Sequence, residues 1–165
     1  MNHEIALSRA REIADRVLAP AARQNDNEAR FSTEAVDALG RAGLLGLTLP
    51  NEFGGLGLGP RTFAAVTATL AEADASVAMV YLMHMCAAAT IAAARPGAAV
   101  AQILAEIASG THLSTLAFSE SGSRSHFWAP LSRAPQRHWR RYYGEEVVGD
   151  ERGLLSELCG FDARA

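Results

Sequence analysis

The sequence predicts a mainly α-helical protein. Through the first two thirds of its 165 residues, apolar side chains recur every three or four positions, which is the spacing of a buried helix face. Proline and glycine stand between these stretches, where helices begin and end. A short apolar run, residues 113–118, then predicts a strand, and an irregular tail follows.

The composition indicates one folded domain in a reducing compartment. Hydrophobic residues make up 49% of the chain and charged residues 20%, which excludes disorder throughout. A net charge of −3 gives no attraction to nucleic acid or to an anionic membrane. The start lacks the apolar core of a secretion signal, and Cys86 and Cys159 lack metal or redox spacing. We therefore expect a cytoplasmic protein without a metal site.

The first predicted helix precedes Pro20, which is expected to end or kink it. A second helix begins at Ser32, a suitable N-cap, and ends near Gly43, a suitable helix end. Between these two residues, Val36 and Leu39 are expected to face inward. The buried stripe of the first helix is formed by Ala6, Ala10, Ile13, Ala14 and Val17.

Three further helices follow a glycine-rich loop at residues 51–59. The first begins at Pro60, where proline suits the first turn, and lasts until a break at residues 74–76. An uncharged helix continues to Arg95, and the last helix ends at Ser109-Gly110. The expected buried residues are Phe63, Val66 and Leu70 in the first of the three and Val100, Ile103, Leu104 and Ile107 in the last.

The uncharged stretch, residues 75–94, has two interpretations. About 20 apolar residues is the length of a membrane span. However, much of the stretch is alanine, which drives membrane insertion only weakly, and Ser76, His84 and Thr90 interrupt it. These features favour a buried helix of a protein without membrane attachment.

Two motifs in the helical part have a structural and a functional interpretation. Residues 55–59, Gly-Leu-Gly-Leu-Gly, lack the G-x-G-x-x-G spacing of a nucleotide loop, which favours a structural turn. His84 lies on the uncharged helix and is either a ligand or acid–base group, or a buried hydrogen-bonded side chain. Because no second ligand lies nearby in the sequence, the second interpretation is favoured. No G-x-S-x-G motif or other nucleophile arrangement is present.

A basic and aromatic cluster, residues 137–143, lies in the tail. Arginine and aromatic side chains together suit nucleic acid. Acidic residues follow at once, which favours a solvated tail instead.

Three segments, in order, resemble the acyl-CoA dehydrogenase family. Residues 39–57 contain Leu-Gly-Arg-Ala-Gly-Leu-Leu-Gly and Pro-Asn-Glu-Phe-Gly-Gly-Leu-Gly, which are similar to a family segment of the same spacing. Residues 71–78 are similar to the approach to the family's long internal helix, and residues 116–123 take the place of its flavin loop. The resemblance covers roughly residues 4–134 and is carried by the order of the three segments.

The resemblance implies an FAD-dependent oxidoreductase that removes two hydrogens from an acyl thioester such as acyl-CoA, and an intact protein that forms homo-oligomers. It implies a helical domain at residues 1–110 and the start of a middle β domain, with the flavin loop, at residues 111–134. The implied flavin contacts are Leu116, Phe118, Ser119 and Ser125. A hydroxyl at Ser119 would suit the flavin's N5 or O4, because a donor there stabilises the charge of reduction.

The sequence departs from the family in and after the flavin loop. The family commonly has Gly-Ser-Asp at residues 124–126 and proline at Ser121. Its Trp-containing flavin strand and its catalytic carboxylate have no match in residues 135–165. Since desaturation needs a base, the resemblance predicts a fragment that is inactive alone, with no catalytic residue assigned. The alternative is a short helical protein that binds a partner and performs no chemistry.

The tail at residues 135–165 is predicted to be disordered or derived from a frameshift. The chain has no lysine, which suggests a GC-rich gene. When the tail is back-translated and read one nucleotide later, residues 145–153 permit Lys-Lys-Ser-Trp-Val-Thr-Ser-Ala-Gly. That peptide is similar to the family's missing flavin strand. We hypothesise a frameshift near Ala134-Pro135.

Overall fold

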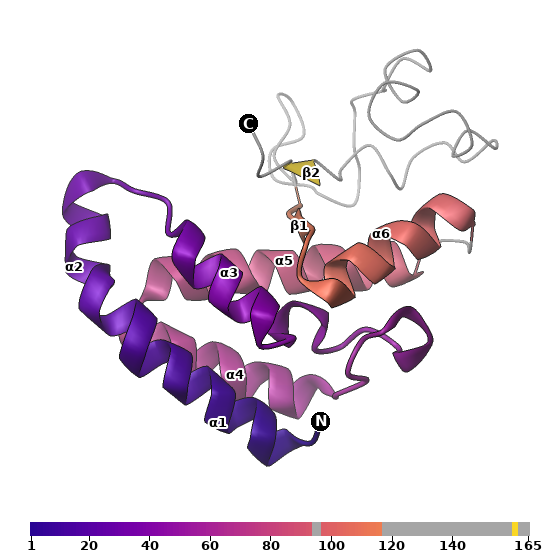
Figure 1. Ribbon diagram of the computed structural model, residues 1–165, viewed down its shortest axis with the longest axis horizontal. Helices are drawn as coiled ribbons and strands as arrows, with labels where there is room; N and C mark the ends of the chain where they lie inside the picture. Colours follow the sequence, from indigo (N-terminus) through magenta and orange to yellow (C-terminus); the bar gives the residue numbers. More distant parts are fainter. Residues whose placement is uncertain (94–96, 117–159, 162–165) are drawn as a thin grey trace, which may run out of the picture.

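The computed structural model of the chain describes residues 1–93, 97–116 and 160–161, and the described part is mainly α-helical (Figure 1). Helices α1, α4 and α5 lie side by side, α3 packs across them, and α6 packs along the second half of α5. The helices are α1 His3–Ile13, α2 Ala19–Glu28, α3 Thr33–Arg41, α4 Pro60–Ala73, α5 Ala75–Ala93 and α6 Ala98–Ser109. The predicted fold class is confirmed.

The helix that begins at His3 does not end at Pro20. A wide π-helical turn, Ala14–Leu18, joins α1 to α2, and the Ala19 N–H bonds to the Ala14 carbonyl. Pro20 lies in the first turn of α2, where a missing N–H costs little. Of the two expected outcomes at Pro20, a helix end or a kink, the helix end is not found, because the chain accommodates the proline by widening the turn before it.

The other predicted helix boundaries are confirmed where the structure describes them. Ser32 precedes α3, and Gly43, with φ of +75°, follows it in the left-handed conformation that glycine adopts readily. Asp74 ends α4, and its side chain accepts the Ser76 and Val77 N–H groups (2.9 and 3.0 Å) to begin α5. Gly110, with φ of +81°, ends α6.

Two apolar clusters share α5. The first joins α5 to α1, α3 and α4, and the second joins its later half to α6 and Leu49. By length and composition α5 could also cross a membrane, and 44% of that stretch is buried within the fold. The buried residues of α5 are Val77, Ala78, Tyr81, His84, Met85, Ala87, Ala88 and Ile91.

Residues 46–58 form a tight structural turn. The N–H groups of Leu56, Gly57 and Leu58 bond to the carbonyls of Gly46, Leu49 and Leu47 at 2.9–3.0 Å. These N–H groups are therefore not available to a phosphate, and the prediction of a structural turn is confirmed.

The end of α6 meets the end of α3 without any side chain between them. A Cβ built on Gly40 would lie 2.9 Å from the Gly110 carbonyl oxygen, and one built on Gly110 would lie 2.6 Å from the Gly40 Cα. Two glycines thus allow direct backbone contact.

The chain leaves α6 through a short strand. Strand β1, Leu113–Ser114, pairs antiparallel with β2, Gly160–Phe161. Of the strand predicted at residues 113–118, these two residues are paired, and residues 117 and 118 lie outside the described part.

The buried glycine of the 46–58 turn gives a stability prediction. In Gly55→Ala the new methyl would overlap the carbonyl oxygen and the side chain of Leu49. We expect the free energy of unfolding to fall by about 3 kcal/mol or the chain not to fold, because overpacking against backbone cannot relax cheaply.

Gly59→Ala is the matched control, since a Cβ at Gly59 has nothing within 4 Å and Gly59 is exposed. Urea unfolding should show a loss below about 1 kcal/mol for this N-cap change. Equal losses in the two variants would contradict the packing of the turn.

Candidate functional site

The segment that leaves α6 carries the flavin contacts that the family resemblance leads us to expect. Of the four predicted contacts, Leu116 is described: its side chain is half-buried and packs against the second apolar cluster. An apolar side chain in that position is compatible with the face of a flavin ring. Phe118, Ser119 and Ser125 lie outside the described residues.

His84 on α5 holds this segment to the core. Its side chain is fully buried, its Nδ1 accepts the Ser114 N–H at 3.0 Å, and its Nε2 lies 3.1 Å from the Leu45 carbonyl oxygen. A nitrogen that accepts carries no proton, so Nε2 carries it and donates to Leu45. One imidazole thus joins α5, the turn after α3 and β1, and the predicted buried, hydrogen-bonded role is confirmed.

Burial keeps His84 neutral. Desolvation lowers its pKa to about 4, although the hydrogen bond to the Leu45 carbonyl favours the charged form, and the nearby His112 acts in the same direction as desolvation. The Ser114 N–H opposes protonation as well, because a proton on Nδ1 would turn the acceptor into a second donor. A neutral imidazole with both nitrogens engaged is a structural link and not a free acid or base.

Tyr81 satisfies the neighbouring carbonyl of the same turn. The 3₁₀ turn Leu44–Gly46 follows α3 and is buried. The Tyr81 hydroxyl, one turn before His84 on α5, donates to the Leu44 carbonyl oxygen at 3.2 Å. Burial raises the pKa of the Tyr81 phenol, so it stays a donor.

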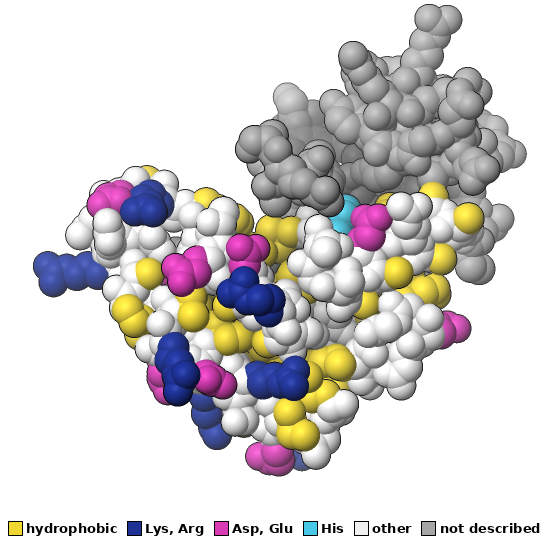
Figure 2. All heavy atoms as spheres, viewed as in Figure 1, with side chains coloured by type: hydrophobic (Ala, Val, Ile, Leu, Met, Phe, Trp, Pro, Cys, Tyr) yellow, Lys and Arg dark blue, Asp and Glu magenta, His cyan; other side chains and the backbone are white. Residues whose placement is uncertain are grey.

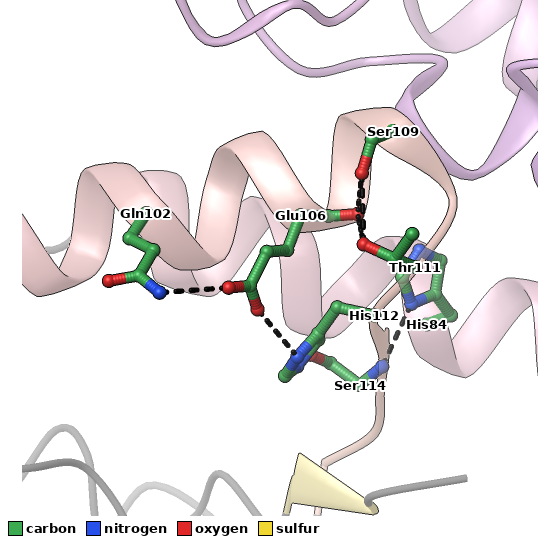
Figure 3. Close-up of polar contacts among 7 residues, drawn as sticks. All are labelled: His84, Gln102, Glu106, Ser109, Thr111, His112 and Ser114. Carbon is green, nitrogen blue, oxygen red and sulfur yellow. Dashed lines mark hydrogen bonds and ion pairs between the residues drawn. The ribbon is translucent and has the colours of Figure 1, made fainter. Parts of the chain in front are cut away.

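A polar chain continues from Ser114 to the surface of α6 (Figure 3). Ser114 Oγ lies 2.8 Å from His112 Nε2, and His112 Nδ1 lies 3.8 Å from Glu106 Oε2. Gln102 donates to the other carboxylate oxygen of Glu106 at 2.9 Å. The carbonyl of Glu106 accepts from the Thr111 N–H and hydroxyl and from the Ser109 hydroxyl, which closes the end of α6.

These polar side chains hold main-chain groups in place and do not form a catalytic arrangement. Serine, histidine and glutamate follow one another, but the 3.8 Å gap between His112 and Glu106 is too long for a hydrogen bond, and Ser114 is 5% exposed. In the described part of the chain, no group of three or more His, Cys, Asp or Glu side chains could hold a metal ion.

The sequence singled out His84 but missed Tyr81 and Ser114. A signal for Tyr81 exists: it lies three residues before His84, which puts both polar side chains on the same face of an otherwise uncharged helix. Ser114 gives no such signal, because its main-chain N–H is what binds.

A groove of about 310 Å³ lies elsewhere, between α2, the loop before α3 and the start of α5. Its apolar lining includes Phe31, Val36 and Val80. Asp74 also lines it, but that carboxylate already caps α5. Over the visible face of α1–α3, basic and acidic side chains are intermixed, and neither sign forms a patch of its own (Figure 2).

The helical array places the described part of the chain among mainly α-helical domains. The match is to a specific family: residues 2–111 fit the model described as acyl-CoA dehydrogenase, N-terminal domain. The chain belongs to the acyl-CoA dehydrogenase family.

Several characterised or named proteins are similar to the chain. "Probable acyl-CoA dehydrogenase FadE25" of Mycobacterium tuberculosis is 27% identical over 139 residues, which are 83% of this chain and 36% of the relative. The (2S)-methylsuccinyl-CoA dehydrogenase of Cereibacter sphaeroides is 31% identical over 79% of this chain and 24% of its own length. The 3-sulfinopropanoyl-CoA desulfinase of Variovorax paradoxus is 37% identical over 42% of this chain and 18% of its own length. The chain thus spans about a third or less of these relatives.

The burial of His84 predicts acid sensitivity. In the unfolded chain His84 takes up a proton near pH 6.5, whereas in the folded chain it stays neutral down to about pH 4. The contribution of His84 to the free energy of unfolding is therefore fully present above pH 6.5. It decreases as the pH falls from 6.5 to 4, by roughly 3 kcal/mol in all.

The measurement is urea unfolding at pH 7.5, 6 and 5 for the wild type and for His84→Asn. The difference between the two proteins isolates His84 from the other histidines. Parallel pH dependences in the two proteins would show that His84 is not buried neutral.

Proposed function

We propose that this chain forms the amino-terminal helical part of an FAD-dependent acyl-CoA dehydrogenase, which desaturates an acyl thioester between its α and β carbons. The observation that carries the proposal is the match of residues 2–111 to that family's N-terminal domain, continued at Leu116 by the segment that resembles the flavin loop. When bound, FAD would accept the hydride. Leu116, Phe118, Ser119 and Ser125 are the residues proposed to contact it.

The outer face of α5 supports this proposal. Met79 is 58% exposed, and Leu82, Met83 and Cys86 are partly exposed on the same uncharged face. An apolar face of this kind on a central helix suits contact with another part of the protein or with an apolar ligand. An acyl chain or a covering domain has that chemistry.

We further propose that the chain is inactive by itself. Removal of the α proton needs a carboxylate or another base held against the substrate. The described acidic side chain nearest to β1 along the chain, Glu106, is engaged with Gln102 and lies beside His112. The base is therefore expected from a part of the intact enzyme that these residues do not supply.

A chimaera tests the proposed function. Residues 2–134, which include Ser114 and the four proposed flavin contacts, would replace the corresponding segment of the mycobacterial relative, whose full length supplies the remaining domains. We expect the purified chimaera to retain FAD and to lose flavin absorbance on anaerobic addition of an acyl-CoA. The isolated chain, mixed with FAD and the same acyl-CoA, should not reduce an electron-accepting dye.

The parent enzyme is the control for FAD content and bleaching. A chimaera that is folded by circular dichroism but retains no FAD would contradict the proposal. A folded, monodisperse isolated chain without flavin affinity would then favour the alternative, a helical protein that binds a partner without chemistry.

The frameshift proposal for residues 135–165 has its own test, which is resequencing of the gene across the codons for Ser132 to Gln136 and onward. We expect a single-base change there to restore Lys-Lys-Ser-Trp-Val-Thr in a frame that continues. If the frame stands as given, the tail is native sequence and the frameshift proposal is wrong.

A further inference from the structure

We propose that His84 is a positioning residue for the flavin-facing segment, because it fixes β1, and through it Leu116, against α5. The inference rests on the proposed function, in which Leu116 borders the flavin. It concerns a contact between side chain and main chain that involves no reacting atom.

The two hydrogen bonds of His84 join parts of the chain that are far apart in the sequence. His84 is fully buried at the middle of α5, and its two ring nitrogens bond to main-chain groups that lie 39 and 30 residues away in the sequence. Since a rigid ring spans both, the distance between the Leu45 carbonyl and the Ser114 N–H is fixed by the imidazole itself. A change at one bond therefore displaces the other.

Two hydrogen bonds of Ser114 involve side chains, besides its pairing with Gly160 of β2. The Ser114 N–H donates to His84 in the core, and the Ser114 Oγ lies within hydrogen-bond distance of His112. His112 belongs to the same short segment and faces Glu106 on the more exposed side of α6. The bond to His84 is thus the one of the two that ties β1 to a buried helix.

Ser114 and Leu116 are close together along the backbone. Leu116 follows two residues later and packs against the second apolar cluster. Two residues span at most about 7 Å of extended chain, so a displacement of Ser114 moves the backbone that carries Leu116. The position of the side chain predicted to meet the flavin therefore depends on the bond at His84 as well as on the apolar cluster.

Two substitutions separate the two bonds. In His84→Asn, the amide oxygen stands near the position of Nδ1 and can still accept the Ser114 N–H, while the bond to Leu45 is lost. In His84→Gln, the amide nitrogen reaches toward the position of Nε2 and can still donate to Leu45, while the acceptor for Ser114 is lost. Each variant removes one buried bond, so both should lower the melting temperature.

The decisive readout is amide hydrogen exchange in the full chain, followed residue by residue by NMR. We expect the Ser114 amide to exchange at least tenfold faster in His84→Gln than in His84→Asn. A general loss of stability would speed exchange in both variants alike, so equal Ser114 rates in the two would overturn the proposal.

A measurement on the wild type does not depend on either variant folding. Imidazole ¹⁵N shifts should show an Nε2-protonated His84, and a coupling across the hydrogen bond should join Nδ1 to the Ser114 amide nitrogen. An Nδ1-protonated ring would overturn the proposal.

FAD affinity, measured by flavin fluorescence in the chimaera described above, separates this inference from the proposed function. A weaker affinity in His84→Gln than in His84→Asn supports the link from His84 to Leu116. Equal affinities, with Ser114 exchange increased in His84→Gln alone, would overturn that link. Loss of FAD by the unsubstituted chimaera overturns the proposed function, and the exchange rates still decide whether His84 holds β1.

Discussion

Two buried carbonyl groups, those of Leu44 and Leu45, constrain the rest of this domain. They lie in the 3₁₀ turn that follows α3, where the Leu44 carbonyl accepts the Leu47 N–H at 3.2 Å and the Leu45 carbonyl bonds to the side chain of His84. A buried carbonyl without a hydrogen bond costs about 1–3 kcal/mol. Tyr81 adds a second donor to the Leu44 carbonyl, and His84 supplies the donor for the Leu45 carbonyl. Because the other nitrogen of His84 accepts the Ser114 N–H, the turn, α5 and the segment that follows α6 meet at this side chain.

Helices α3 to α6 were predictable from the sequence because residues that begin or end helices flank each of them, whereas α2, which has Pro20 in its first turn, was not predicted. Proline at the start of α4, and glycine after α3 and α6, mark where the backbone changes direction, and the apolar spacing between them assigns the buried faces. The same logic failed at Pro20. Whether a proline breaks a helix or is absorbed by a wider turn depends on the packing of both neighbouring turns, which local sequence does not encode.

The positioning role of His84 was only half predictable. Its burial follows from its place on an uncharged helix, but its partners are main-chain groups, and every residue carries those. A main-chain donor such as the Ser114 N–H is present at almost every residue, so the sequence does not indicate which of them His84 binds. The connection between α5 and β1 is therefore visible only in the structure. The two clusters that share α5 account for part of its apolar composition, since 44% of the stretch is buried, and the face that remains exposed is uncharged as well.

The contact between Gly40 and Gly110 has a consequence for how the protein is made. The end of α3 needs backbone that lies 70 positions later in the sequence, and Leu45 needs His84, which in turn needs Ser114. A growing polypeptide can therefore form α1, α3 and α4 as they leave the ribosome, yet their packing is completed only after residue 114 has emerged. Until then the uncharged α5 lacks part of its cover, and this is the interval in which a nascent chain is most exposed to chaperones and to aggregation.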